Sequence, residues 1–200
     1  MVQAIKTKII NATIELLEKE DYNSLSLVKV ARKSKIKKSQ VQDLFIDIDS
    51  IIYSYLDNVD IKMINQVKKD ANLSDMHDII FNLVMARIDH YQENRTSIIN
   101  LLSKKSSFRY KYLIRSARLA KYPDILYQET EDSAPKLTKI TKEIGFLFIY
   151  KQSIFFWLEN EDTSKVMSHL DGLLDKGSTC FGYIKTPLNI LDDFITKMQN

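Results

Sequence analysis

The strongest chemical signal in the sequence is a basic segment over residues 29–38. It carries six basic residues and no acidic residue, and six positive charges are twice the chain's formal net charge of +3. Clustered cationic side chains bind nucleic-acid phosphates and release the counterions held there. The segment therefore predicts a phosphate-binding surface, with a solvated lysine-rich surface as the alternative. Its basic residues are Lys29, Arg32, Lys33, Lys35, Lys37 and Lys38.

Two short helices are predicted to position this basic segment. Ser26 is a suitable N-cap for the first, whose apolar residues recur at helical spacing up to Ala31. The second covers about residues 39–45 and turns Val41 and Phe45 inward. In a helix-turn-helix motif the second helix enters the major groove, and flanking basic groups neutralise phosphates. The basic segment lies where such a motif would dock.

Helical spacing of apolar residues continues along the chain and predicts an all-α fold of about nine or ten helices. Pro123 and Pro135 are expected to bracket a loop or short turn segment, and Gly177 is suited to a left-handed C-cap. No alternation typical of strands appears. Beyond the two short helices, the expected ranges are about 5–17, 49–69, 75–91, 93–104, 108–121, 136–158, 163–177 and a piece after Pro187.

Composition excludes several classes of function. One cysteine, Cys180, rules out an internal disulfide and any thiolate metal cage, and four glycines argue against glycine-rich phosphate loops. His77, His90 and His169 lack a zinc-type spacing, and no base is identified for Cys180. No signal peptide or membrane span is visible. We expect a cytoplasmic protein that is not an enzyme and has no metal or cofactor.

The order of helices, together with four stretches of sequence, resembles the TetR family of bacterial regulators. The resemblance covers about residues 6–59 without a gap, which is the family's DNA-binding domain. Its apolar skeleton fits well, although a skeleton specifies a fold and not an activity. The stretches are Ile9–Leu17 (IINATIELL), Leu25–Ala31 (LSLVKVA), Ile36–Phe45 (IKKSQVQDLF) and the pair Ile51 and Ile52.

This resemblance implies a helix-turn-helix DNA-binding domain over residues 1–48 and a larger effector-binding and dimerisation domain over residues 49–200. The implied partner is double-stranded DNA. Gln40 and Gln42 are the expected base readers, because a glutamine amide can pair bidentately with adenine. The full set of expected DNA-binding residues is Ser26, Lys29, Lys35, Lys37, Lys38, Ser39, Gln40 and Gln42.

Four positions depart from the family pattern. Lys35 stands where the family has a turn glycine, and Lys37 stands where it has a small hydroxyl residue. Gln42 and Ile48 replace a tyrosine and a lysine that contact phosphates in the family. Two explanations are open: the lysines at 35, 37 and 38 have taken over phosphate binding, or the domain has lost its DNA function.

The second half of the chain resembles the family's dimerisation helices. The helix over residues 136–158 is apolar on more than one face, so it needs two partners, one of which could be a second subunit. The alternative is the central helix of a monomeric bundle. A homodimer is expected, with an interface formed by Phe148, Phe155, Trp157, Val166, Leu170 and Leu173.

The same stretch is also similar to TetR-fold lipid-binding accessory proteins of ubiquinone biosynthesis, which lack DNA binding. The segment after Pro187 could match their extra C-terminal helix. This similarity implies the alternative function, a lipid- or quinone-binding accessory protein.

Aromatic residues near the middle helices predict a cavity for a small apolar effector, with ordinary core packing as the alternative. The preferred interpretation is therefore a ligand-responsive transcriptional regulator, acting as a repressor. The candidate effector-binding residues are Phe108, Tyr110, Tyr112, Tyr122 and Tyr127.

Overall fold

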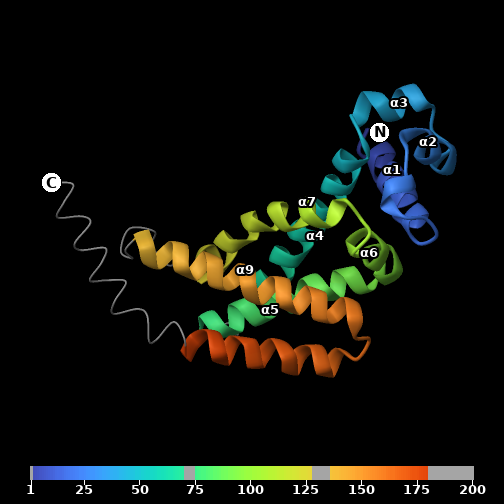
Figure 1. Cartoon of the computed structure of the whole chain (residues 1–200). Helices are drawn as coiled ribbons and strands as arrows, with labels where there is room; N and C mark the ends of the chain where they lie inside the picture. Colours follow the sequence, from blue (N-terminus) through green and yellow to red (C-terminus); the bar gives the residue numbers. More distant parts are fainter. Residues whose placement is uncertain (1, 70–74, 128–135, 180–200) are drawn as a thin grey trace. The chain divides into compact units, whose positions relative to one another are not determined.

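The structure is a computed structural model that describes residues 2–69, 75–127 and 136–179, and every regular element in these ranges is helical (Figure 1). The expected all-α fold is confirmed. No described helix is both long and apolar enough to cross a membrane. The elements are α1 (Val2–Leu17), η1 (Tyr22–Ser24), α2 (Leu27–Ser34), α3 (Lys38–Leu44), α4 (Ile48–Lys69), α5 (Met76–Gln92), α6 (Arg95–Leu102), α7 (Phe108–Ser116), η2 (Ala117–Lys121), α8 (Tyr122–Tyr127), α9 (Lys136–Glu159) and a helix over residues 163–179.

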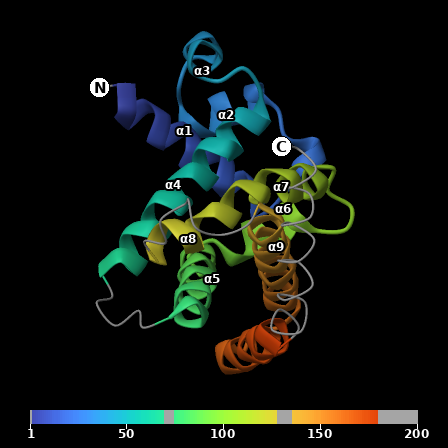
Figure 2. The same ribbon diagram turned by 90° about the vertical axis from the view of Figure 1, so that its left-hand side faces the viewer.

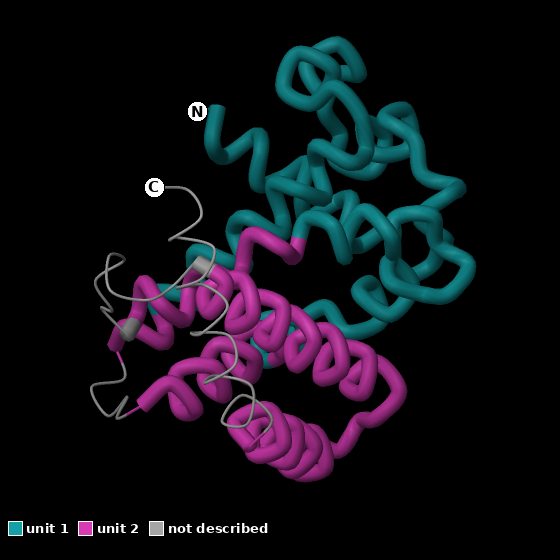
Figure 3. Tube along the Cα trace, turned by 60° about the vertical axis from the view of Figure 1, so that its left-hand side comes forward, with its two compact units in different colours: residues 1–65, 89–115 teal, residues 66–88, 116–200 magenta. Residues whose placement is uncertain are grey.

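The chain divides into two compact units (Figure 3). Unit 1 comprises residues 1–65 and 89–115, and unit 2 comprises residues 66–88 and 116–200. Unit 1 contains the predicted helix-turn-helix region together with most of α4, the end of α5, and α6 and α7. The functional division at residue 48 stays a prediction, because the units follow packing rather than function.

The first three helices form a small domain, the head, around one apolar cluster (Figure 2). Side chains that recur at helical spacing in the sequence, such as Ile9, Val30 and Val41, turn into this cluster and bury the apolar faces of their helices. Their burial supplies the stabilisation that three short helices lack on their own. The buried members are Ile9, Ile10, Val30, Ala31, Val41, Phe45 and Ile51.

Polar contacts within unit 1 attach the head to α6. The last carbonyls of a helix have no partner within that helix. At the end of α1 two of them accept hydrogen bonds from α6. Ser97 Oγ donates to the Ile14 carbonyl at 2.7 Å, and Asn100 Nδ2 donates to the Leu17 carbonyl at 2.7 Å. The Ser97 contact is buried, so losing it would leave an unsatisfied carbonyl.

Tyr22, Asp49 and Lys111 join η1, α4 and α7 in one polar group. The Tyr22 hydroxyl and the Lys111 ammonium each donate to one oxygen of the Asp49 carboxylate. The Tyr22 ring also packs on Phe108, with ring centroids 5.2 Å apart. Partial burial, followed by the hydrogen bond to Asp49, raises the pKa of Tyr22 to about 12. The hydrogen bond to Asp49 raises the pKa of Lys111.

In unit 2, α9 and the helix over residues 163–179 lie side by side and antiparallel, joined by a three-residue turn (Figure 1). The turn ends at Asp162, whose Oδ1 accepts the Ser164 N–H at 2.9 Å. This cap explains why the second helix begins at residue 163, as the sequence predicts.

Gly177 does not end that helix, so the expected C-cap is wrong. The helix continues through residue 179, and no described glycine has a positive φ. A Cβ on Gly177 would lie only 3.2 Å from Cδ1 of Ile149 on α9. The glycine therefore permits close approach of two helices rather than a left-handed turn.

Two further expectations need correction. The predicted helix over residues 108–121 is α7 followed by the 3-10 segment η2, and the segment after Pro123 is helical in α8 rather than a loop. Pro123 is the second residue of α8, where a missing N–H breaks no intrahelical hydrogen bond. The predicted piece after Pro187 lies outside the described residues.

The Tyr22–Asp49 contact predicts a pH dependence of stability. A raised folded-state pKa means that the contact contributes fully below pH 10, the ordinary tyrosine value, and is lost as the pH rises towards about 12. Across this window the free energy of unfolding should fall more steeply for the wild type than for Tyr22→Phe. NMR titration of ¹³C-labelled tyrosine should place the Tyr22 pKa near 12 and move it towards 10 in Asp49→Asn. An unchanged Tyr22 pKa in Asp49→Asn would contradict the assigned contact.

Candidate nucleic-acid interface

The turn between α2 and α3 sets the direction of the second helix of the motif. Ser26 caps α2 by accepting the Lys29 N–H, as the sequence predicts. At the other end Lys35 is left-handed, with φ 54° and ψ 37°, and the Ile36 N–H donates to the Ala31 carbonyl at 3.1 Å. A left-handed residue followed by such a bond is a common helix ending that usually contains glycine. Here a lysine takes that position and keeps its side chain exposed.

Two lysines of the basic segment are held in ion pairs within the head. Lys29 Nζ donates to Glu20 Oε2 at 2.6 Å and to the Ser24 carbonyl at 2.9 Å. The hydrogen bond from Lys29 lowers the pKa of Glu20. Lys33 Nζ lies 2.7 Å from Glu15 Oε2. Lys29 was expected to bind phosphate, but its ammonium is already occupied by a carboxylate and a carbonyl.

The remaining four cations are exposed and have no acidic partner in the part of the chain that the structure describes. They lie on the last turn of α2, in the turn itself and at the start of α3. Arg32 belongs to this group but was not among the predicted DNA contacts, although its place within the basic segment could have indicated it. We call these four residues, Arg32, Lys35, Lys37 and Lys38, the cationic edge.

The exposed face of α3 includes the predicted residues Ser39, Gln40 and Gln42, and it also includes Asp43. Val41 is fully buried and fixes the inward side of the helix. At 3.6 residues per turn, Gln40 and Gln42 are about 200° apart, so they flank the outward face on opposite sides. The centre of that face carries Ser39 and Asp43, which are one turn apart and both exposed.

Asp43 is the residue of this face that sequence reasoning missed. Its carboxylate would repel phosphate, but in the major groove it can accept a hydrogen bond from the N4 amino group of cytosine. Directly after α3, Ile46 is 90% exposed and offers an apolar group of the kind that contacts thymine methyls. The sequence could have indicated Asp43, because this residue lies on the side of the helix opposite the inward-facing Val41.

The predicted effector-binding aromatic residues do not share one environment. Phe108 is buried in unit 1 against the rings of Tyr22 and Tyr53, with centroids 5.2 and 5.6 Å away. Tyr112 is buried in the same unit, with its hydroxyl 3.2 Å from that of Tyr91.

Of the remaining candidates, Tyr110 is 72% exposed in unit 1, whereas Tyr122 is partly buried in unit 2. The side chain of Tyr127 lies outside the described residues. Ordinary core packing accounts for Phe108 and Tyr112.

The predicted dimer residues also separate into two groups. Trp157, Val166 and Leu170 are at most 2% exposed, because they pack inside unit 2. Phe148 is 56% exposed, and Phe155 and Leu173 are partly buried. Only the second group offers surface to a partner subunit.

Two solved structures with a similar fold are described as regulators. A TetR transcriptional regulator from Nitrosomonas europaea ATCC 19718 matches with a TM-score of 0.65 and 18% identity, over 86% of this chain and 97% of that one. The dihydroxyacetone kinase operon activator DhaS matches with a TM-score of 0.51 and 14% identity, over 91% of this chain and 97% of that one. No protein-family model and no curated protein matches the sequence. The chain has a TetR-like fold.

The left-handed lysine in the turn generates a prediction about stability. A residue with a Cβ is strained by roughly 1–2 kcal/mol in this conformation, and glycine avoids that strain. Glycine also makes the unfolded chain more flexible, which lowers the stability by about 0.4–1 kcal/mol. Lys35→Gly should therefore stabilise the protein by roughly 0.5–1 kcal/mol in urea denaturation. Lys35→Ala is the matched control, since it removes the same charge but keeps Cβ. Equal stabilisation by alanine would assign the effect to charge instead of conformation.

Proposed function

We propose that this chain is a DNA-binding transcriptional regulator that acts as a homodimer and responds to a small apolar effector. The observation that carries the proposal is the cationic edge, four exposed cations where α2 ends and α3 begins, which have no acidic partner among the described residues. The TetR-like fold supports it, since the two similar structures named above are described as a transcriptional regulator and an operon activator.

In the proposed complex, α3 enters the major groove and the cationic edge binds the flanking phosphates. The edge supplies affinity and register, because phosphate contacts carry no sequence information directly. Sequence is read by Ser39 and Asp43 at the centre of α3, with Gln40 and Gln42 reaching bases on either side. This assignment keeps the predicted polar residues of α3, adds Asp43, and removes Lys29 from the phosphate contacts.

The proposed dimer interface uses the accessible apolar side chains of α9. Ile140, Ile144 and Phe148 are exposed and recur every four residues, so they form one stripe on the helix. Phe155 continues the stripe at helical spacing. Large apolar stripes are uncommon on the surface of a monomer, and two such stripes can bury each other in a symmetric contact.

Pairing two heads would place two α3 helices in successive major grooves about 34 Å apart. An effector bound in the larger domain, over residues 49–200, would shift the separation of the heads and so disfavour the DNA-bound state. We propose repression as the direction of control, with the bound dimer occluding a promoter until the effector arrives. A reporter assay with the protein's own upstream region would distinguish repression from activation.

Charge reversal at the cationic edge tests the DNA-binding function. Lys37→Glu with Lys38→Glu should abolish specific binding, measured by fluorescence anisotropy, to the DNA upstream of the gene. The wild type should prefer that DNA over a scrambled duplex by ~10³ or more. Its affinity should fall with salt, with each phosphate contact adding about 0.9 to the logarithmic slope.

The matched control is Lys68→Glu with Lys69→Glu at the end of α4, which changes the net charge equally and should leave specific binding intact. Circular dichroism should show unchanged helical content in both double variants. Wild-type binding that is weak, equal for both duplexes and lost with salt would reject a specific regulator. It would favour the lipid-binding alternative, which extraction of bound lipid would then test.

The apolar stripe predicts how the oligomeric state responds to mutation. Phe148→Glu should convert a dimer into a monomer in sedimentation equilibrium, because a carboxylate cannot be buried without a partner. Tyr110→Glu, which changes an exposed aromatic residue of unit 1, is the matched control and should stay dimeric. A wild-type chain that is monomeric at micromolar concentration would argue against the proposed dimer.

A further inference from the structure

The exposed side of α7, in unit 1, carries two large apolar side chains. Tyr110 is 72% exposed and Ile114 is 60% exposed. They are four residues apart, so they lie on the same side of the helix, one turn from each other. Single exposed apolar residues are ordinary, whereas adjacent ones form a patch of the kind that contacts a partner.

The segment that contains this pair is strongly basic. Residues 103–115 include five basic residues and no acidic residue. Lys104 and Lys105, in the loop before α7, are exposed and have no acidic partner among the described residues. The three basic residues that donate hydrogen bonds to groups of unit 1 are Arg109, Lys111 and Arg115.

Hydrogen bonds to the head fix the backbone of the loop that carries the two lysines. The side-chain amide of Asn23, in η1, donates to the Lys105 carbonyl at 3.0 Å. The oxygen of the same amide accepts the Ser107 hydroxyl at 2.7 Å and the Ser107 N–H at 3.3 Å. A surface that is fixed before binding loses less conformational entropy when a partner arrives. We call Lys104, Lys105, Tyr110 and Ile114 the α7 patch.

We propose that the α7 patch binds a segment of a different protein that combines acidic side chains with an apolar anchor. Tyr110 and Ile114 supply the apolar contact, and tyrosine is enriched among the residues that carry most of the energy of protein interfaces. Lys104 and Lys105 supply charge complementarity, which steers acidic segments to the patch and selects against basic ones.

The size of the patch argues against a membrane as its occupant. The nine residues of α7 include two exposed large apolar side chains. Helices that bind a membrane surface bury a longer apolar face at the boundary of the lipid chains. Two side chains suffice for a protein contact, because a few residues carry most of its binding energy.

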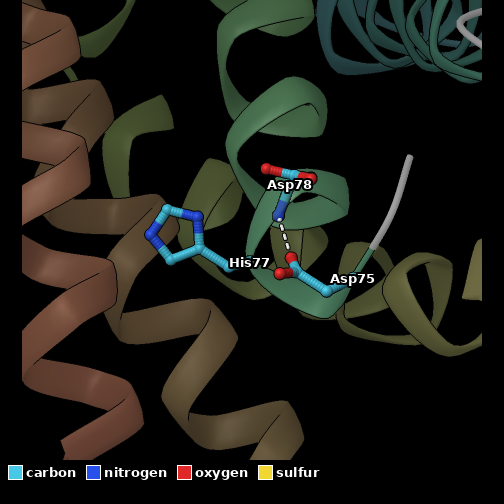
Figure 4. Close-up of side chains that lie close together, drawn as sticks. All are labelled: Asp75, His77 and Asp78. Atoms are coloured by element: carbon cyan, nitrogen blue, oxygen red, sulfur yellow. Dashed lines mark hydrogen bonds between the residues drawn. The ribbon is translucent and has the colours of Figure 1, made fainter. Parts of the chain in front are cut away.

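A second copy of this chain would offer acidic groups at the start of α5, in unit 2. Figure 4 shows Asp75 and Asp78 there, beside His77. Asp75 Oδ1 accepts the Asp78 N–H at 2.9 Å, so this carboxylate already caps the start of the helix. The neighbouring apolar residues Met76 and Ile79 are partly or fully buried. This acidic surface therefore lacks the apolar anchor that the α7 patch would contact.

Peptide selection on the full chain tests the proposal. A library of random peptides displayed on phage is selected on the wild type and counter-selected on Tyr110→Ser with Ile114→Ser. The enriched peptides should carry several acidic residues around one or two large apolar ones. In fluorescence anisotropy, an enriched peptide should bind the counter-selection variant at least about tenfold more weakly than the wild type.

Further variants test the role of charge. Lys104→Glu with Lys105→Glu should weaken binding of the same peptide and remove most of its salt dependence. The matched controls are Ile61→Ser, which removes an apolar side chain of α4 that is 57% exposed, and Lys37→Glu with Lys38→Glu on the cationic edge. Both should leave peptide binding unchanged. All the substituted side chains are exposed, so circular dichroism should show unchanged helical content.

The proposal is overturned if selection enriches no peptide, if it enriches only basic or uncharged peptides, or if binding depends on the cationic edge instead of the α7 patch. Co-sedimentation with phosphatidylglycerol vesicles that requires Tyr110 and Ile114 would assign the patch to a membrane and overturn it. Loss of the dimer in Tyr110→Glu would assign the patch to a second copy, with the same consequence. None of these readouts uses DNA, so failure of the proposed DNA binding and failure of this proposal are distinguishable.

Discussion

The direction of α3 depends on the backbone at Lys35, where the chain turns between two short helices. Its left-handed φ of 54° ends α2, and α3 begins three residues later at Lys38. Such a conformation costs a lysine roughly 1–2 kcal/mol. The apolar cluster of the head outweighs that cost, because Val30 and Val41 are both fully buried and hold α2 and α3 on α1. Packing thus enforces a turn that local preference disfavours.

Ion pairs within the head separate structural lysines from those available to a ligand. Lys29 and Lys33 lie on α2 and reach acids at the end of α1 or just after it, so their charges support the packing of α2. The cationic edge lies where α2 ends and α3 begins, beyond the reach of those acids. A charge count along the sequence treats all six cations alike, although two of them are held in ion pairs within the head.

Periodicity predicted the fold well because a helix with one apolar face has one way to bury it. The head cluster contains the residues that this spacing indicates, and Ser26 caps α2 as its type predicts. Errors arose where a residue type serves more than one purpose. Gly177 allows contact with Ile149, and Pro123 is accommodated in the first turn of α8.

The candidate sites were harder to predict because they depend on which partner each polar group meets. Asp43 follows from the helical phase, but Lys29 could be assigned only once Glu20 was placed beside it. Trp157 illustrates the same difficulty for apolar residues. A large apolar side chain suits a dimer interface as well as the core of unit 2, where Trp157 is buried. The Lys105 carbonyl meets a side chain of the head that is 82 positions away in the sequence, so no local pattern predicts this contact.

The two explanations for the altered polar residues of the head differ in electrostatic consequence. The four cations of the cationic edge lie within seven residues and have no acidic partner in the described part of the chain. They repel one another, and this repulsion disfavours the folded head at low ionic strength. Phosphates placed along the edge would relieve it, so binding of a polyanion and stability of the head are linked. In a head that binds no polyanion, nothing would offset the repulsion among these four cations. The arrangement of charge therefore favours the explanation in which the lysines at 35, 37 and 38 took over phosphate binding.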